Sequence, residues 1–191
     1  MAGSFETNQA NFHGFDPARL FMGKPIDDWP KDVVFYPEER EKWSRVDDVL
    51  MNSYMDLQRI RAYIFPIYSK RLQEAIQAAG IHDFQFLPCR VADAEGNDFE
   101  GYAVANVLTT RDALDPGNSK IYYHDQTLPK LNVAGNISAI VQAALRLERL
   151  EGCHAFRLPE DLREMFVSEY FRKIFRKLKA TGISFRDTVI V

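Results

Sequence analysis

One short run of polar residues has the types needed for acid–base catalysis: Tyr122-Tyr123-His124-Asp125. A histidine beside a tyrosine and a carboxylate could move protons during a reaction. Successive side chains of a strand point to opposite faces, however, so Tyr123 and Asp125 would face away from His124. A small hydrolase that uses Tyr123, His124 and Asp125 is therefore an alternative hypothesis, and polar residues at a strand end are the simpler interpretation.

The histidines and cysteines predict no local metal site. The four histidines are His13, His82, His124 and His154. None of them lies three or four residues from another or from a cysteine, which is the spacing that a local zinc site needs. Cys89 and Cys153 are expected to be reduced thiols, and a strand would turn Cys153 away from His154. The sequence also lacks the glycine-rich and serine-hydrolase motifs. We therefore expect no cofactor, no metal and no catalytic residue.

Four carboxylates lie within eight residues of a predicted hairpin loop: Asp93, Glu95, Asp98 and Glu100. Their order does not match that of an EF-hand. A solvated hairpin tip is the simpler interpretation. The functional interpretation is an acidic finger that steers a basic partner surface, because complementary charge accelerates association. This loop is the predicted partner-binding site.

Five cationic side chains form a stripe on a predicted helix: Arg172, Lys173, Arg176, Lys177 and Lys179. Such a stripe can contact phosphates, so a nucleic-acid-binding module that uses residues 172–179 is a second alternative. A solvated helix face is the simpler interpretation, because cations are favoured near a helix C-terminus. The net charge of -3 and the pI of about 5.8 predict neither nucleic acid nor an anionic membrane as a partner.

The helix that carries this stripe belongs to a unit present twice, over residues 64–86 and 165–185. Each copy predicts a short apolar strand, a serine cap, an amphipathic helix, a stop glycine and a second strand. Alignment of Ser69 with Ser168 pairs four apolar positions: Leu72 with Phe171, Ala75 with Ile174, Ile76 with Phe175 and Ala79 with Leu178. The stop glycine of the second copy lies three residues further from its serine, so the second helix is predicted to be about one turn longer.

Strands are predicted on both sides of these helices. Residues 84–91 and 99–108 are typical of a hairpin, and Pro88 indicates an edge or a bulge in its first strand. Further strands are expected over residues 33–36, 121–123, 154–158 and 188–191.

Two more helices are predicted. The clearest covers residues 137–152, capped by Asn136 or Ser138, and residues 47–57 could form a short one. The expected fold class is α+β, with a mainly antiparallel sheet, about three helices and two similar strand–helix–strand units.

Length and composition favour a single domain over residues 1–191. With 46% hydrophobic residues, the chain can bury a sizeable core. Residues 1–14 are expected to be loose, and lobes are possible over residues 15–91 and 92–191. The N-terminal residues lack the pattern of a signal peptide, and no apolar stretch approaches the roughly 20 residues that span a bilayer. We therefore expect a cytoplasmic protein with no membrane partner; its oligomeric state stays open.

Several motifs occur in a specific order: GKPIDDWP from Gly23, the first serine-capped unit, VLTTRDALD from Val107, CHAFRL from Cys153 and MFVSEYFRKIFRKLKATGISF from Met165. This order resembles the immunity-protein family of bacterial polymorphic toxin systems. Members of that family carry an alnvl…vDalD stretch, a following FRL and a closing ifVSerFkealekagltGlrF. The resemblance extends over residues 23–185. The tail after Phe185 continues beyond the family's signature.

The resemblance implies a protein that binds a cognate toxin or effector domain, delivered between competing bacteria, and blocks it by direct contact. It implies no catalytic residue. Such an inhibitor needs a rigid scaffold and a complementary surface of about 800 Å² per partner. Without an export signal, the toxin that it neutralises is expected to act in the cytosol.

Overall fold

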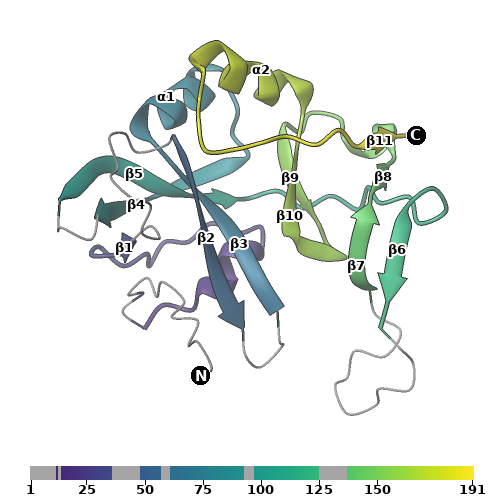
Figure 1. The fold of residues 1–191 in the computed structure, drawn as a ribbon, viewed down its shortest axis with the longest axis horizontal. Helices are drawn as coiled ribbons and strands as arrows, with labels where there is room; N and C mark the ends of the chain where they lie inside the picture. Colours follow the sequence, from purple (N-terminus) through teal and green to yellow (C-terminus); the bar gives the residue numbers. More distant parts are fainter. Residues whose placement is uncertain (1–11, 13, 36–47, 57–60, 93–96, 125–136) are drawn as a thin grey trace, which may run out of the picture.

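The computed structural model describes residues 12, 14–35, 48–56, 61–92, 97–124 and 137–191, and of residues 51–56 and 61–64 only the strands that they form. Its largest element is a five-stranded sheet (Figure 1). The strands, in spatial order, are β1 (Val34–Phe35), β4 (Phe84–Ala92), β5 (Asp98–Val107), β3 (Arg61–Tyr68) and β2 (Val49–Asp56). Within this five-stranded sheet, only the β1–β4 pair is parallel. The predicted α+β class with a mainly antiparallel sheet is confirmed.

The predicted hairpin over residues 84–91 and 99–108 is confirmed by β4 and β5. Pro88 lies opposite Ala103, and the register shifts between Cys89 and Val91, which is the predicted bulge. The carbonyl of Pro88 accepts a hydrogen bond from the indole of Trp29 at 2.8 Å. A proline can therefore occupy this strand because the ladder is interrupted next to it.

Side chains of β5 alternate between two cores on the two faces of the sheet. Tyr102 and Val104 pack with the first 3-10 helix, η1 (Pro17–Phe21), and with the segment that follows it. Ala105 and Val107 face the other side, where the two α-helices lie. Both faces of the sheet are thus covered, which explains why every residue from Tyr102 to Val107 is buried.

The two helices, α1 (Lys70–Ala78) and α2 (Glu169–Leu178), lie side by side at the top of Figure 1. Each begins at its predicted serine, directly after β3 and after β10 (Asp161–Val167) respectively. The predicted inward stripe is confirmed, since its central residues are fully buried in one cluster: Leu72, Ile76, Phe171 and Phe175. These apolar stripes fix both helices on the sheet.

The second copy departs from the prediction at its C-terminal end. Lys179 adopts a left-handed conformation with a φ of 51°, and its N–H closes the last turn of α2. The helix therefore has ten residues against nine for α1, and the predicted extra turn up to Gly182 is wrong. The strand expected at Phe185 is also absent from the described residues, and the next strand is β11 (Val189–Ile190).

The helix predicted over residues 137–152 is wrong. This segment forms β7 (Ile137–Gln142), β8 (Ala144–Leu145) and a 3-10 turn, η3 (Leu147–Arg149). β7 pairs antiparallel with β6 (Lys120–Tyr123), and β8 pairs in parallel with β11. The apolar run suits either period, and its β-branched residues fit a strand once β6 provides a partner.

The short helix predicted over residues 47–57 is also wrong, because β2 pairs with β3 along all eight of its residues. The strands predicted near residues 33–36, 121–123, 154–158 and 188–191 are found, each within its described residues. In the described part of the chain, two α-helices therefore replace the expected three.

A buried arginine joins two strands in the C-terminal half of the chain to η1. Arg157 lies on β9 (Ala155–Leu158), which pairs antiparallel with β10, and is 1% exposed. Its guanidinium lies 4.7 Å from the ring centre of Phe21 and donates to the carbonyls of Leu162 and Arg163. Burial lowers the pKa of Arg157 to about 10. The loss of this side chain would loosen the junction between η1, β9 and β10.

An ion pair with a buried carboxylate connects α1 to the turn that follows α2. The carboxylate of Asp48 accepts hydrogen bonds from the Ser69 hydroxyl at 2.8 Å and from the Thr181 N–H at 3.2 Å, and it pairs with Arg71. Burial opposes ionisation of Asp48, but the bonds from Arg71 and Ser69 outweigh it, so the pKa of this carboxyl is lowered. Asp48 thus joins α1 to the turn that follows α2.

Candidate docking surface

The acidic hairpin is only partly within the described residues. Asp93 and Glu95 lie outside them, whereas Asp98 and Glu100 are exposed on the first residues of β5. Asp98 forms an ion pair with Arg90 of β4. Part of the predicted acidic charge is therefore neutralised within the hairpin itself.

The tyrosines of the proposed acid–base run lie on the surface of β6. Tyr122 and Tyr123 are exposed, His124 is half-buried, and Asp125 lies outside the described residues. A register shift separates Tyr122, which faces Ala139, from Tyr123, which faces Ile137. No hydrogen bond joins Tyr123 to His124 in the part of the chain that the structure describes, so these two side chains form no acid–base pair.

The two cysteines are buried free thiols, as predicted. Burial raises the pKa of Cys89 to about 12, and burial together with the nearby Asp83 raises the pKa of Cys153. Cys153 turns toward the Ala155 carbonyl, whereas His154 turns toward Ser168. Both residues lie before β9, so the strand alternation on which the prediction relied does not apply to them. Both thiols stay protonated near neutral pH and are poor nucleophiles.

A serine and a histidine that are distant in sequence meet beside α2. Ser168 Oγ lies 3.0 Å from His154 Nδ1 and also accepts the N–H of Phe171 at 3.1 Å. The carboxylate of Asp83 binds the backbone N–H groups of His154 and Ala155 instead of the imidazole. The pair therefore resembles a helix cap more than a nucleophile activated by a base and a carboxylate.

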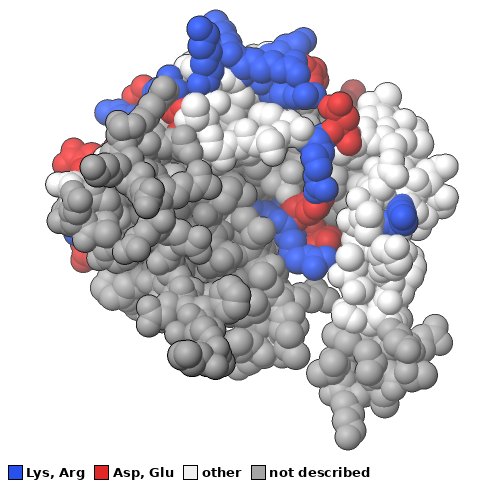
Figure 2. All heavy atoms as spheres, viewed as in Figure 1, with Lys and Arg blue, Asp and Glu red and all other residues white. Residues whose placement is uncertain are grey.

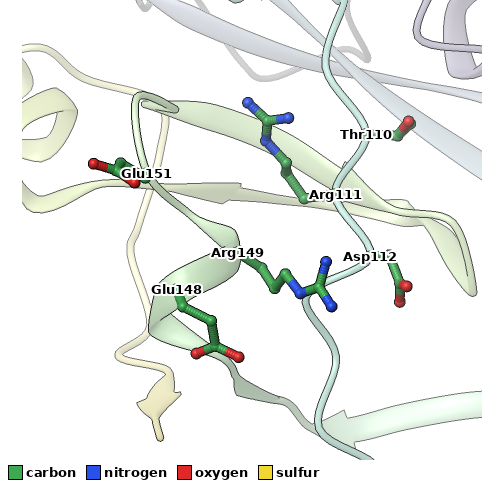
Figure 3. Close-up of a pocket in the computed structure, with 6 residues that line it drawn as sticks. All are labelled: Thr110, Arg111, Asp112, Glu148, Arg149 and Glu151. Carbon is green, nitrogen blue, oxygen red and sulfur yellow. The ribbon is translucent and has the colours of Figure 1, made fainter.

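A polar depression of about 350 Å³ lies between the segment before β6 and η3 (Figure 3). One threonine and charged residues of both signs line it: Thr110, Arg111, Asp112, Glu148, Arg149 and Glu151. Figure 3 shows Glu151 and Thr110 pointing to opposite sides, and only Arg149 extends toward Asp112. Side chains that diverge in this way do not converge on one ligand.

Metal ligands and membrane-spanning helices are the remaining features to consider among the described residues. No group of three or more histidine, cysteine, aspartate or glutamate side chains is arranged to hold a metal ion there. Among the described helices, neither length nor apolar character is sufficient for a membrane crossing.

The cationic stripe lies on the outer face of α2. Arg172 pairs with Asp187 at 2.8 Å, and Arg176 pairs with Glu169 at 3.0 Å. The lysines of the stripe are exposed and have no ion pair among the described residues: Lys173, Lys177 and Lys179. Lys and Arg side chains gather over the helices at the top of Figure 2.

A different surface holds most of the large exposed apolar side chains of the described residues. They lie on β6, β7, η3 and β11 and at the C-terminal residue: Tyr122, Tyr123, Val141, Leu147, Val189, Ile190 and Val191. We term this surface, which includes β8, the ribbon end. The other large apolar side chains that are exposed in the described part of the chain are Met22 and Tyr170.

The ribbon end has one buried and one open face. Ile121 of β6 and Ile140 of β7 are paired and pack in a third core cluster. The next residue on each strand points outward, with Tyr122 54% exposed and Val141 51% exposed. This alternation keeps the ribbon folded while it leaves an aromatic and an aliphatic side chain in solvent.

Charge is sparse on the face of this region that Figure 2 shows, although Lys120 of β6 and Glu148 and Arg149 of η3 are also exposed. Figure 2 shows the lobe at the right, where β6, β7, β8 and β11 lie, almost free of Lys, Arg, Asp and Glu. β11 pairs on one side only, with β8, so its outer edge has no strand partner among the described residues. A surface with many exposed apolar side chains and an open strand edge is typical of a protein-docking site.

The sequence prediction missed the ribbon end because it assigned residues 137–152 to a helix. In that helix Val141 would face the core, whereas in β7 it faces solvent. The exposed tyrosines of β6 had two interpretations from the sequence, an acid–base role or polar positions at a strand end, and neither is a docking role. The usable signal was the pair of adjacent tyrosines on a short strand, because exposed tyrosine is enriched at protein interfaces.

Comparison with known proteins gives one match over nearly the whole chain. The sequence model of an immunity protein family, described as "Immunity protein family (Imm11)", matches residues 6–189. No curated protein matches the chain.

Proposed function

Because this chain belongs to the Immunity protein family (Imm11), we propose that it binds a cognate bacterial toxin and neutralises it by direct protein–protein contact. The observation that carries the proposal is the family match over residues 6–189. The toxin would be an effector domain delivered between competing bacteria, and the inhibition would take place in the cytoplasm.

The ribbon end is the surface that we propose for this contact. Apolar area that leaves water supplies most of the free energy of protein association, and tyrosines at the centre of an interface often dominate it. Tyr122 and Val141 are held on paired strands whose other face is buried, so they lose little conformational freedom on binding. An apolar toxin surface would fit best against Tyr122 and Val141, because a charge buried against these two side chains would lack a partner.

The described residues support an inhibitor more than an enzyme. The best serine–histidine pair caps a helix, and the thiols are buried. The polar depression beside η3 has diverging side chains. A protein that blocks its target by occupying a surface needs none of this chemistry.

The direct test combines the purified chain with the toxin domain encoded by the neighbouring gene. We expect a 1:1 complex in analytical ultracentrifugation and loss of toxin activity in proportion to the amount of chain added. A toxin from an unrelated system serves as the control and should neither bind nor lose activity. If the paired toxin forms no complex at micromolar concentrations and keeps full activity, the proposed function is wrong.

A further inference from the structure

The outer face of α2 combines one exposed aromatic ring with lysines that have no ion pair among the described residues. Tyr170, Lys173 and Lys177 follow each other at spacings of three and four residues, so they share one side of the helix. Tyr170 is 46% exposed, and both lysines are exposed. These three residues lie on the side of α2 opposite the buried Phe171 and Phe175.

Tyr170 is held at both ends although its ring is exposed. Its hydroxyl donates to the carbonyl of Ala79, at the end of α1, over 3.3 Å. Its ring centre lies 5.0 Å from that of His154, and His154 is in turn bonded to Ser168 at the start of α2. An aromatic side chain fixed in this way contributes contact area at a small entropic cost.

The charge of α2 is strongly asymmetric. From Glu169 to Lys179 the chain has five cationic side chains and one carboxylate, although the whole chain has a net charge of -3. Arg172 and Arg176 are occupied by carboxylates of this chain, whereas the three lysines are not among the described ion pairs. The uncompensated positive charge therefore comes from lysines on the exposed face.

We propose that Tyr170, Lys173 and Lys177 form a second contact with the toxin, at an acidic region of its surface. The inference rests on the proposed function. Carboxylates of the partner would complement the lysines and steer association, and the fixed ring of Tyr170 would slow dissociation.

The observations favour an acidic protein over a nucleic acid. The arginines, which bind phosphate in a forked geometry, are already bound by Asp187 and Glu169.

The test measures binding of the neighbouring-gene toxin domain to Lys173→Glu/Lys177→Glu by stopped-flow association at two salt concentrations. We expect kon to fall about tenfold at 50 mM salt and the difference to shrink at 500 mM, because screening removes steering. The matched control is Lys24→Glu/Lys31→Glu, which changes the net charge equally at exposed lysines away from α2. It should change kon less than about twofold.

A second variant tests the aromatic contact. Tyr170→Ala should raise koff about tenfold. Tyr170→Phe, which keeps the ring and loses the bond to Ala79, should raise it less than about threefold. Circular dichroism of each variant verifies that α2 is folded. Equal kinetics for wild type and both α2 variants would overturn the inference and leave the proposed function standing. No complex with the wild type would overturn both.

One further arm distinguishes the other class of partner. A fluorescent single-stranded RNA of about 20 nucleotides and a DNA duplex of similar length are titrated with wild type and with Lys173→Glu/Lys177→Glu. We expect no salt-sensitive binding to either probe. Binding that the charge reversal abolishes would assign this face to nucleic acid and overturn the inference.

Discussion

Two antiparallel strand pairs of this molecule use their apolar residues in opposite ways. In β5, which pairs with β4, both faces are covered, and Tyr102 to Val107 are all buried. In the β6–β7 ribbon only one face is covered, and Tyr122 and Val141 face solvent. The start of β5 and the ribbon lie at opposite sides of Figure 1.

The difference separates what holds the fold together from what is available to a partner. The buried side chains of β5 cannot contact another protein without unfolding. The exposed side chains of the ribbon contribute little to folding, since one face of the ribbon already packs in the third core cluster. We therefore expect substitutions of the buried β5 side chains to reduce stability more than toxin binding. Substitutions of the exposed ribbon side chains should reduce toxin binding more than stability.

The largest effect is expected for binding at the ribbon. Tyr122→Ala/Val141→Ala should weaken the complex with the toxin about a hundredfold in Kd, or roughly 3 kcal/mol, because it removes two apolar contacts at one place. Isothermal titration calorimetry measures this change. Met22→Ala, an exposed apolar residue elsewhere, is the matched control and should leave Kd unchanged. Equal affinities of the ribbon variant and wild type would remove the ribbon from the interface.

The same substitution in the two strand pairs gives the next effect. Val104→Ala, at a fully buried site on β5, should lower the free energy of unfolding by about 2 kcal/mol through lost packing and a cavity. Val141→Ala, on the exposed face of β7, should change it by less than about 0.5 kcal/mol. Urea unfolding measures both. Similar losses would show that the ribbon contributes to the core and would break the contrast.

Acid sensitivity is expected in the helix-covered half of the molecule. The pKa of Asp48 is lowered in the folded protein, so its contribution is present above the ordinary pKa of an aspartate and is lost as pH falls through the lowered value. Asp48→Asn should reduce stability by about 1.5 kcal/mol at pH 7. Urea unfolding between pH 2 and pH 7 should show the two proteins converging in acid. A constant difference over that range would rule out this role of Asp48.

The smallest effect is expected at the acidic hairpin. The variant replaces its four carboxylates with alanine: Asp93, Glu95, Asp98 and Glu100. This change should slow association with the toxin no more than about threefold, since Asp98 is already paired with Arg90. Stopped-flow measurements at low salt test this. A larger loss than that of the ribbon variant would place the interface at the hairpin, as the sequence alone predicted.

Local signals predicted the parts of the fold that depend on near neighbours. Both helices begin at their predicted serines because the apolar stripe and the cap lie within one short segment. The two serines still differ, since Ser168 caps its helix and Ser69 donates to Asp48. That difference depends on Asp48, which lies 21 residues from Ser69 in the chain, and no local pattern contains it.

Pairing between distant segments explains the errors. Residues 137–142 became β7 because Ile140 pairs with Ile121, and β2 formed because β3 lies beside it. The ribbon end was absent from the predicted candidate surfaces for the same reason, since the exposure of Val141 follows only once this segment is a strand. The tyrosines of β6 could be recognised from the sequence, but the absence of a covering element could not.

Amide hydrogen exchange of the chain, alone and bound to its toxin, tests the proposed docking face most directly. We predict slower exchange in the complex for β6, β7 and β11, and no change for Asp98 to Glu100 at the start of β5. Protection confined to the start of β5, with β6, β7 and β11 unchanged, would contradict the assignment of the ribbon end as the docking surface.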